Sequence, residues 1–332
     1  MKTYLSICIP MYNCENYIVE CLKSIKKQSM SEYVEVIIID DCSTDQSKEV
    51  ARRFVEENHM NAHIFLNAQN FGVAYSRNCA IEKASGEYIM FLDSDDTLDS
   101  DFFENIFDAI NDGEYDMLLW GFNEVDEELQ LKQSMTNSSE VTLGKEICKK
   151  LSEYRFQICI GSYMIRKEIL IDNNIKVSCK YKYGEDQELN YKCLLHSRQV
   201  KVLDKSFYNY RYNPNSAMNI SSDFRRFDTV ESRKELLQYL KSNFIQEIEL
   251  IERFQNFLIP EAIITVTRVM VYSGIHKKNL KEYWKNRGYA EILKESAREK
   301  KLSKNLYLEM MMQMYTWSLY SVLCKLKKHV RR

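Results

Sequence analysis

Short apolar runs alternate with segments of helical periodicity throughout the first hundred residues. The apolar runs occupy residues 5–9, 34–39, 64–66 and 88–92. Mainly apolar strands are typical of a parallel sheet that is covered on both faces, because each crossover connection lays a helix over the sheet. The sequence therefore predicts an α/β fold in the order βαβαβαβ. Its second helix is expected to begin near Ser43, whose hydroxyl would cap the first turn.

Beyond residue 100 the pattern is coarser and predicts a second, helical region. Helices are expected at 101–110, at 145–151 and, opening at 184–186, over a segment with Leu189, Cys193 and Leu194 inward. A strand is expected at 117–122, a polar excursion at 126–141, and a closing pair of strands at 201–203 and 207–212. From residue 223 almost every segment has helical period. We therefore expect a catalytic domain over 1–220 and a helical region over 221–332.

Charge and cysteine usage narrow the class of protein. The 46 Lys and Arg residues nearly balance 48 Asp and Glu, which disfavours a general nucleic-acid binder. The ten cysteines form no Cys-x-x-Cys pair and are expected to be reduced, as in a cytoplasmic protein. The first apolar run is broken by Pro10, Asn13 and Glu15, which argues against a signal peptide. The expected location is the cytoplasm.

Polar residues follow three of the predicted strands, at the edge where such a sheet keeps its ligands. Residues 10–13 follow the first strand, Asp40 and Asp41 end the second, and residues 93–96 end the fourth. Each aspartate taken alone could equally be a turn or helix-capping residue. Asp93 and Asp95 form an Asp-x-Asp pair, and paired carboxylates together with phosphate oxygens are the usual ligands of Mg²⁺ or Mn²⁺. The strand ends thus predict a metal and phosphate site.

Five segments in this order resemble the inverting family 2 glycosyltransferases of the GT-A fold, which build bacterial surface polysaccharides. They are residues 6–15 (SICIPMYNCE), 39–45 (IDDCSTD), 70–72 (NFG) with 76–78 (SRN), 86–89 (GEYI) and 92–96 (LDSDD). The resemblance is close over residues 4 to about 125 and weaker to about 217. It implies a GT-A fold, Rossmann-like, with a mostly parallel sheet and flanking helices, plus a C-terminal helical region.

The resemblance also implies a role for each matching residue. The nucleoside would be bound by Pro10, Tyr12 and Glu15, the base by Asp41 with Asp40, the base or diphosphate by Arg77, the ribose by Asp93 beside Ser94, the metal by Asp95 with Asp93, and phosphate by Arg211 and Ser216. Relatives often have a histidine near the metal where this chain has Asn213, so metal dependence is less firmly implied than the fold. The implied donor is a nucleotide sugar, with uridine the favoured base.

The resemblance implies a general base as well. Glu185-Asp186 follows Gly184 at a predicted helix start and resembles the family's Glu-Asp motif, in which the aspartate takes the acceptor's proton. Without the resemblance, Asp186 is read as a carboxylate stabilised by the helix dipole. A single in-line displacement would give a β-linked product from an α-linked donor. The implied acceptor is a saccharide or a lipid-linked oligosaccharide.

The C-terminal segment is basic. Residues 270–332 hold 15 Lys and Arg against 5 Asp and Glu, and the last helix pairs an apolar band with a polar stripe at Glu309 and Gln313. This pattern suits a helix on an anionic membrane surface, and it suits equally a packing or homodimer helix. Two rival functions stay open: a haloacid-dehalogenase-like phosphatase that uses Asp93, and a non-catalytic nucleotide or sugar binder.

Overall fold

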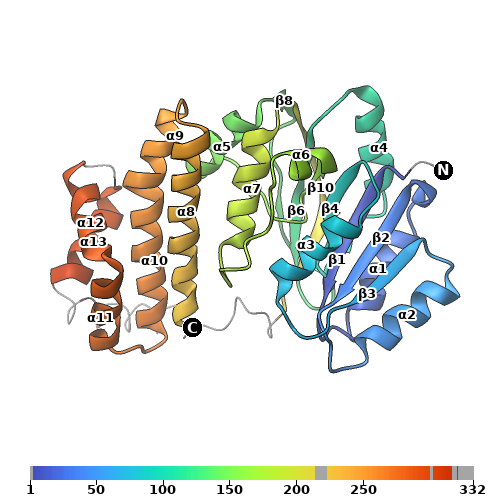
Figure 1. The fold of residues 1–332 in the computed structure, drawn as a ribbon, viewed down its shortest axis with the longest axis horizontal. Helices are drawn as coiled ribbons and strands as arrows, with labels where there is room; N and C mark the ends of the chain where they lie inside the picture. The colour runs from blue at the N-terminus through green and yellow to red at the C-terminus, as the bar shows by residue number, and fades with distance from the viewer. Residues whose placement is uncertain (1–2, 214–222, 300–301, 316–319, 321–332) are drawn as a thin grey trace. The chain divides into compact units, whose positions relative to one another are not determined.

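The computed structural model describes residues 3–213, 223–299, 302–315 and 320 of the 332-residue chain. The chain forms two compact units (Figure 1). The first, here called the sheet unit, comprises residues 1–179 and 186–214; the second, the helical unit, comprises residues 180–185 and 215–332. A six-residue segment that precedes Asp186 in the chain therefore belongs with the C-terminal helices.

The described residues of the sheet unit form one ten-stranded sheet. Eight strands follow the order β3-β2-β1-β4-β9-β6-β10-β5, while β7 pairs with β6 and β8 with β10. The strands are β1 (Leu5–Met11), β2 (Val34–Asp40), β3 (Ala62–Leu66), β4 (Tyr88–Phe91), β5 (Thr97–Leu98), β6 (Met117–Val125), β7 (Leu131–Met135), β8 (Glu140–Thr142), β9 (Tyr163–Arg166) and β10 (Val200–Arg211). β1 to β4 are mutually parallel, as predicted, and antiparallel pairings of β5, β7, β8 and β9 make the whole sheet mixed.

Helices cover both faces of the parallel half of the sheet (Figure 1). The helices of the sheet unit are α1 (Ile18–Lys26), α2 (Ser47–Glu57), α3 (Val73–Lys83), α4 (Phe102–Asp112), α5 (Gly144–Ser152), α6 (Lys167–Asp172) and α7 (Glu185–His196), with a 3-10 turn at Ser31–Tyr33. Apolar residues of α1, α2 and α4 share one core with the odd-numbered residues of β1. Because strand side chains alternate, α3 covers the opposite face, where it contacts β1 and β2. This arrangement leaves the carboxyl ends of the parallel strands at one edge.

Three local expectations were wrong. The second helix begins at Ser47 and not near Ser43, because Ser43 sits in a turn in which its hydroxyl accepts from the Asn13 N–H. The polar excursion at 126–141 contains strands β7 and β8, whose short, exposed residues lack an apolar signal. The expected closing pair of strands is the single strand β10, in which bulges interrupt the pairing with β6 between Val202 and Tyr208.

A buried carboxylate ties the parallel strands together. Glu35 of β2 is 6% exposed. It accepts hydrogen bonds from Ser6 Oγ of β1 (2.5 Å), from Ser85 Oγ (3.0 Å) and from the Gly86 N–H (3.1 Å). A Cβ at Gly86 would stand 2.6 Å from Ser6 Oγ, so only glycine leaves room for this clamp. The clamp fixes the entry to β4 against β1 and β2, and β4 leads directly into the Asp93–Asp96 segment.

Glu35→Gln is expected to lower the free energy of unfolding by about 1–3 kcal/mol at pH 7, because its amide group meets donors that require an acceptor. Burial disfavours the ionised Glu35, but the hydrogen bonds from Ser6 and Ser85 outweigh it and lower the pKa below the ordinary 4.5. The ionised clamp thus stabilises the fold above that pH, and the stabilisation is lost as pH falls toward the lowered pKa. Urea denaturation across pH should show the wild-type advantage shrinking below pH 4.5. Glu57→Gln, an exposed change at the end of α2, should show no such advantage.

The helical unit has its own apolar core. Its helices are α8 (Asp228–Asn243), α9 (Ile248–Arg253), α10 (Ile259–Tyr272), α11 (Lys277–Arg287), α12 (Tyr289–Arg298) and α13 (Lys304–Tyr315), with a 3-10 turn at Phe224–Phe227 and a π-helical turn at Phe254–Leu258. Phe227, Ile263, Leu280 and Leu293 are fully buried in one cluster that joins these elements. Trp284 donates to Thr267 Oγ1 across that cluster (3.1 Å).

The polar stripe of α13 points into this core. Gln313 is 1% exposed and donates to the Ile264 carbonyl of α10 (3.0 Å), and Glu309 pairs with Arg268 (3.1 Å). Met310, from the apolar band, is buried in the same cluster. α13 is thus a packing helix over its described residues. Within the described part of the chain, no helix is long and apolar enough to cross a membrane. The basic residues from Lys325 to Arg332 lie outside the described residues.

Candidate functional site

The loop after β1 and the loop after β2 are joined by reciprocal hydrogen bonds. Asn13 Oδ1 accepts from the Thr44 N–H (2.8 Å), and Glu15 Oε2 accepts from the Gln46 N–H (2.8 Å). Both loops use left-handed backbone, at Asn13 (φ 47°) and Cys42 (φ 62°). Pro10 is buried at the end of β1, whereas Tyr12 is 47% exposed. Tyr12 therefore presents an aromatic ring beside two rigid loops.

Asp40 and Asp41 are both buried and make different contacts. Asp40 Oδ1 accepts from the Ser43 N–H (3.0 Å), which is a turn contact. Asp41 accepts from Asn67 Nδ2 (2.7 Å) and from the N–H groups of Phe71 (3.0 Å) and Gly72 (2.7 Å). Gly72 has φ 91°, which favours glycine at the head of α3. Asp41 thus organises the loop that leads into the helix carrying Arg77.

Arg77 of α3 contacts the loop after β4. Its guanidinium is 4% exposed and pairs with Asp93 Oδ1 at 2.8 Å. It also lies over the Phe91 ring at 5.8 Å. A buried arginine requires a nearby anion, and Asp93 supplies it. The pair locks α3 to the loop after β4, so the predicted residues Arg77 and Asp93 meet.

Asp95 is two residues further along the loop. Its Oδ2 accepts from Asn213 Nδ2 (3.1 Å), which reaches it from beyond the end of β10. Burial raises the pKa of Asp95, and the neighbouring charge of Asp93 raises it further. Between the two aspartates, Ser94 is buried and bonds the Cys14 thiol. The two predicted metal ligands are therefore adjacent carboxylates that repel each other.

The buried Asp96 was not predicted as a functional residue, although it stands in the same motif. Its Oδ1 accepts from the Arg211 N–H (2.7 Å) and its Oδ2 from the Tyr208 hydroxyl. Burial raises the pKa of Asp96 well above its ordinary value, with Asp95 and Asp93 adding to the effect. These bonds fasten the aspartate loop to β10. The partners of Asp96 lie more than a hundred positions away in the chain, so the sequence gives no local sign of this role.

Arg211 is held in a way that the sequence did not suggest. Its guanidinium, 4% exposed, pairs with Glu20 of α1 (2.7 Å) and lies over the Tyr17 ring at 5.2 Å. It also donates to the Glu127 carbonyl (3.2 Å). The expected contact with phosphate would therefore require the pair with Glu20 to open. Ser216, the other expected phosphate contact, lies outside the described residues.

Asp186 is the second residue of α7, where its Oδ1 accepts from the Gln187 N–H (2.7 Å). Burial raises the pKa of the nearby Tyr163 phenol well above its ordinary value, with Cys193 and Asp186 adding to the rise and Arg77 opposing it. The contacts that join Arg77 to Asp93 and Asn213 to Asp95 do not include Asp186.

The residues at this edge suit a hard cation in one respect. Asp93 and Asp95 offer carboxylate oxygens whose mutual repulsion a cation would relieve. Within the described residues, no three Asp, Glu, His or Cys side chains are grouped so as to hold a metal ion. A cation here would take its other ligands from a phosphate-bearing molecule or from water, as Mg²⁺ commonly does. The nine cysteines that the structure describes are all free thiols.

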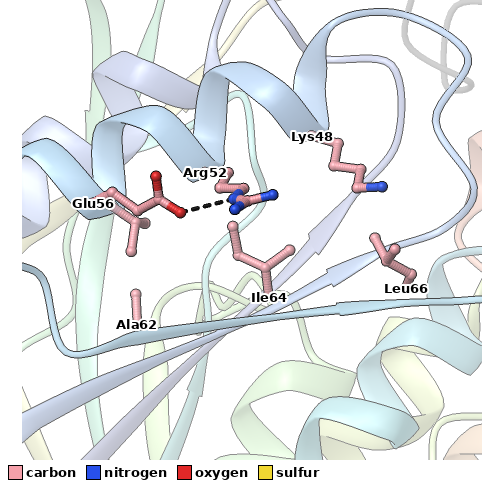
Figure 2. A pocket seen from close by; sticks show the side chains of 7 residues that line it. Lys48, Arg52, Glu56, Ala62, Ile64 and Leu66 are labelled. Atoms are coloured by element: carbon pink, nitrogen blue, oxygen red, sulfur yellow. Dashed lines mark hydrogen bonds and ion pairs between the residues drawn. The ribbon is translucent and has the colours of Figure 1, made fainter.

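A separate pocket of about 380 Å³ lies at the β3 edge of the sheet, between α2 and β3 (Figure 2). Arg52 and Glu56, one turn apart on α2, form an exposed ion pair (2.7 Å) on the helix side of this pocket, facing the side chains of Ala62 and Ile64. Its described lining contains none of the predicted site residues. The strand-end cluster, and not this pocket, is the candidate site.

Comparison with known proteins assigns this chain to a family. The sequence profile of glycosyl transferase family 2 matches residues 6–173. The uncharacterised glycosyltransferase EpsJ of Bacillus subtilis is 31% identical over 229 residues, which cover 66% of this chain and 64% of EpsJ. The poly(ribitol-phosphate) β-N-acetylglucosaminyltransferase TarS of Staphylococcus aureus is 32% identical over 209 residues, 61% of this chain and 35% of TarS. The matched region thus spans less than two thirds of either relative.

Solved structures show the same fold. The crystal structure of S. aureus TarS residues 1–349 in complex with UDP-GlcNAc superposes with a TM-score of 0.67 at 23% identity, covering 91% of this chain and 93% of that chain. The mannosyltransferase PcManGT from Pyrobaculum calidifontis, in complex with GDP-Man and Mn²⁺, gives a TM-score of 0.53 at 15% identity, covering 98% of this chain and 87% of that chain. The predicted GT-A architecture with a C-terminal helical region is confirmed. With its profile match over half of the sequence, the chain belongs to glycosyl transferase family 2.

Proposed function

We propose that this chain is an inverting glycosyltransferase that moves a sugar from a nucleotide diphosphate sugar to a saccharide or lipid-linked oligosaccharide in cell-surface polysaccharide synthesis. The observation that carries the proposal is the cluster formed where β4 ends, in which Arg77, Asp93 and Asp95 come together beside the end of β10. Fixed charges of both signs at one strand-end crevice suit a diphosphate and a cation. The family assignment supports the same reading.

The donor would lie across the carboxyl ends of β1, β2 and β4. Tyr12 offers an exposed ring for the nucleoside, and Pro10 and Glu15 shape the loop that holds it. Asp41, with Asp40 beside it, fixes the loop around the base, and Arg77 with Asp93 stands toward the ribose and diphosphate. Uridine is the proposed base, since TarS, which shares the fold, is solved with UDP-GlcNAc.

Asp93 and Asp95 would hold Mg²⁺ or Mn²⁺, and PcManGT, of the same fold, is solved with Mn²⁺. Such a cation supplies charge neutralisation for a departing nucleoside diphosphate. The Asn213 amide donates a hydrogen bond to the Asp95 carboxylate and orients it. Arg211, once released from Glu20, and Ser216 are proposed to contact phosphate.

Asp186 is proposed as the general base. It would accept the proton of the acceptor hydroxyl while that oxygen forms a bond to the anomeric carbon and the bond from that carbon to the diphosphate breaks. Attack from the face opposite the leaving group inverts the configuration, so an α-linked donor gives a β-linked product. Asp186 lies at the head of α7, where its carboxylate accepts from the Gln187 N–H.

Contact with an anionic membrane is proposed only through the basic residues Lys325, Lys327, Lys328, Arg331 and Arg332, since the described part of α13 packs into the helical unit. A homodimer through the helical unit is the alternative use of this tail. Neither contact enters the catalytic argument.

The experiment that tests the function screens nucleotide sugars for thermal stabilisation and then for transfer. A UDP-sugar with Mn²⁺ is expected to raise the unfolding temperature, because a donor at 100 times its Kd adds about 2.7 kcal/mol. The same donor should then yield free UDP and a β-linked product with a saccharide acceptor. Stabilisation without turnover on any acceptor would indicate a non-catalytic binder. Release of inorganic phosphate from phosphomonoesters would indicate a phosphatase that uses Asp93.

A further inference from the structure

The six residues that precede Asp186 are held by the helical unit. Residues 180–185 cluster with α8 and the following helices, while Asp186 begins the return of the chain to the sheet unit. One peptide bond therefore joins the proposed base to a segment whose contacts come from α8 and the turn before it.

Two hydrogen bonds hold the backbone of the segment. Asp228 Oδ2 accepts from the Lys182 N–H (2.9 Å), and Ser232 Oγ donates to the Gly184 carbonyl (2.8 Å). Asp228 and Ser232 are four residues apart on α8, so they lie on the same face of that helix. Ser232 is 2% exposed. Its bond to the carbonyl two residues before Asp186 is partly buried and restrains that carbonyl.

Gly184 also allows residues 180–185 to lie close against α8. Its φ of 91° lies in the left-handed region that favours glycine. A Cβ at this position would stand 3.1 Å from Thr229 Cα and 3.3 Å from Ser232 Cβ. The segment therefore rests directly on the backbone of α8. A side chain at Gly184 would push the segment away from the helix.

Side-chain contacts surround these backbone bonds. Lys182 pairs with Asp223 (3.5 Å), and the Arg226 guanidinium lies over the Tyr183 ring at 5.4 Å. Lys180 pairs with Glu235 at 2.7 Å, but both side chains are exposed, so this pair adds little. The restraint rests mainly on the close approach of Gly184 to α8 and on the Asp228 bond.

We propose that Ser232 and Asp228 are positioning residues for the glycosyl transfer: by fixing the backbone of residues 182–184 they orient the proposed base Asp186. The inference rests on the proposed function. A base must stand within about 2.6–3.2 Å of the proton it takes. A displacement of about 1 Å can cost about 10² in rate, so a loosened segment would slow transfer. The residues proposed to bind the donor lie in other segments and would keep their geometry.

The test compares two serines of the helical unit that make the same kind of bond. Ser296 is 1% exposed and donates to the Asn256 carbonyl (2.6 Å), away from residues 180–185. Ser232→Ala and Ser296→Ala should lower the unfolding temperature by similar amounts relative to wild type. Ser232→Ala alone should lower the kcat of transfer by about 10- to 100-fold. The KM for the donor and the Kd for UDP with Mn²⁺ should stay within twofold of wild type.

A double mutant separates positioning of the base from general loosening. In an Asp186→Asn background, Ser232→Ala is expected to lower kcat no further, because the group that it orients is gone. An equal loss in both backgrounds would overturn the proposal, as would equal kcat for Ser232→Ala and Ser296→Ala. Loss of UDP binding in Ser232→Ala would also overturn it.

The second position gives an independent check should Ser232→Ala not fold. Asp228→Ala is expected to lower kcat, and Asp228→Asn to restore it, since the amide oxygen still accepts from the Lys182 N–H. Equal kcat of the two variants would contradict positioning by that bond. Wild-type turnover that survives Asp186→Asn would refute Asp186 as the base, and with it this inference. Absence of any transfer by wild type would refute the function itself.

Discussion

Asp186→Asn is expected to lower the kcat of glycosyl transfer by about 10²- to 10⁴-fold, the range that a general base contributes. The asparagine keeps the size of the side chain and can still accept from the Gln187 N–H, so the head of α7 should stay folded. The Kd for UDP with Mn²⁺ should be unchanged, because donor binding is assigned to other residues. Initial-rate kinetics and calorimetric titration of UDP measure the two effects separately.

Glu146→Gln is the matched control for the charge at a helix start. Glu146 stands in the first turn of α5, where a carboxylate interacts with the helix dipole just as Asp186 does in α7. Both variants should lose a small amount of stability, and only Asp186→Asn should lose turnover. An unchanged kcat in Asp186→Asn would show that Asp186 only stabilises the helix start through the helix dipole and is not the base.

The parallel half of the fold was predictable because its strands are buried on both faces. β1 and β2 are fully buried along their length, so every residue had to be apolar or clamped, as Ser6 and Glu35 are. The exposed strands β7 and β8 carry no such signal and are defined only by pairing with β6 and β10. Sequence periodicity reports burial, and these strands are hardly buried.

The site was predictable only in part, for a different reason. Motif order identified Asp41, Arg77, Asp93 and Asp95, and the structure shows the partners of each. The bonds that hold the cluster in place join residues far apart in the chain: Asp96 to Tyr208 over 112 positions, and Glu20 to Arg211 over 191. Neither pair has a spacing that a sequence pattern could reveal. Such contacts arise from β10 lying beside the aspartate loop in the folded sheet.

The basic C-terminal helix shows the same limit. A helix with Met310 in its apolar band and Gln313 in its polar stripe fits a membrane surface and a protein core equally well by periodicity. Gln313 decides between them in the described residues, because its amide donates to the α10 carbonyl of Ile264 and is shielded from solvent. A polar residue in a helical stripe is informative only once its hydrogen-bond partner is known.

Asp99→Asn provides the control for the second large effect, which concerns Asp95. Asp99 Oδ1 accepts from Asn209 Nδ2 (2.8 Å), and Asp95 Oδ2 accepts from Asn213 Nδ2 (3.1 Å), so each carboxylate takes one bond from an asparagine amide. Only Asp95 adjoins the second carboxylate, Asp93, that is proposed to share a cation. Asp99→Asn should therefore leave transfer and its response to Mn²⁺ unchanged.

Asp95→Asn is expected to lower kcat/KM by about 10²- to 10³-fold, because a bound cation contributes several kcal/mol of charge stabilisation. Without metal, the same variant should unfold at a higher temperature than wild type. It removes a half-buried charge that Asp93 repels, and its amide oxygen still accepts from Asn213. Mn²⁺ should strengthen UDP binding to wild type and not to the variant, as titration with and without chelator would show. Equal strengthening by Mn²⁺ in both proteins would place the cation elsewhere. Asp93 pairs with Arg77 and Asp95 bonds Asn213, and the repulsion that remains between the two carboxylates is what a bound cation would relieve.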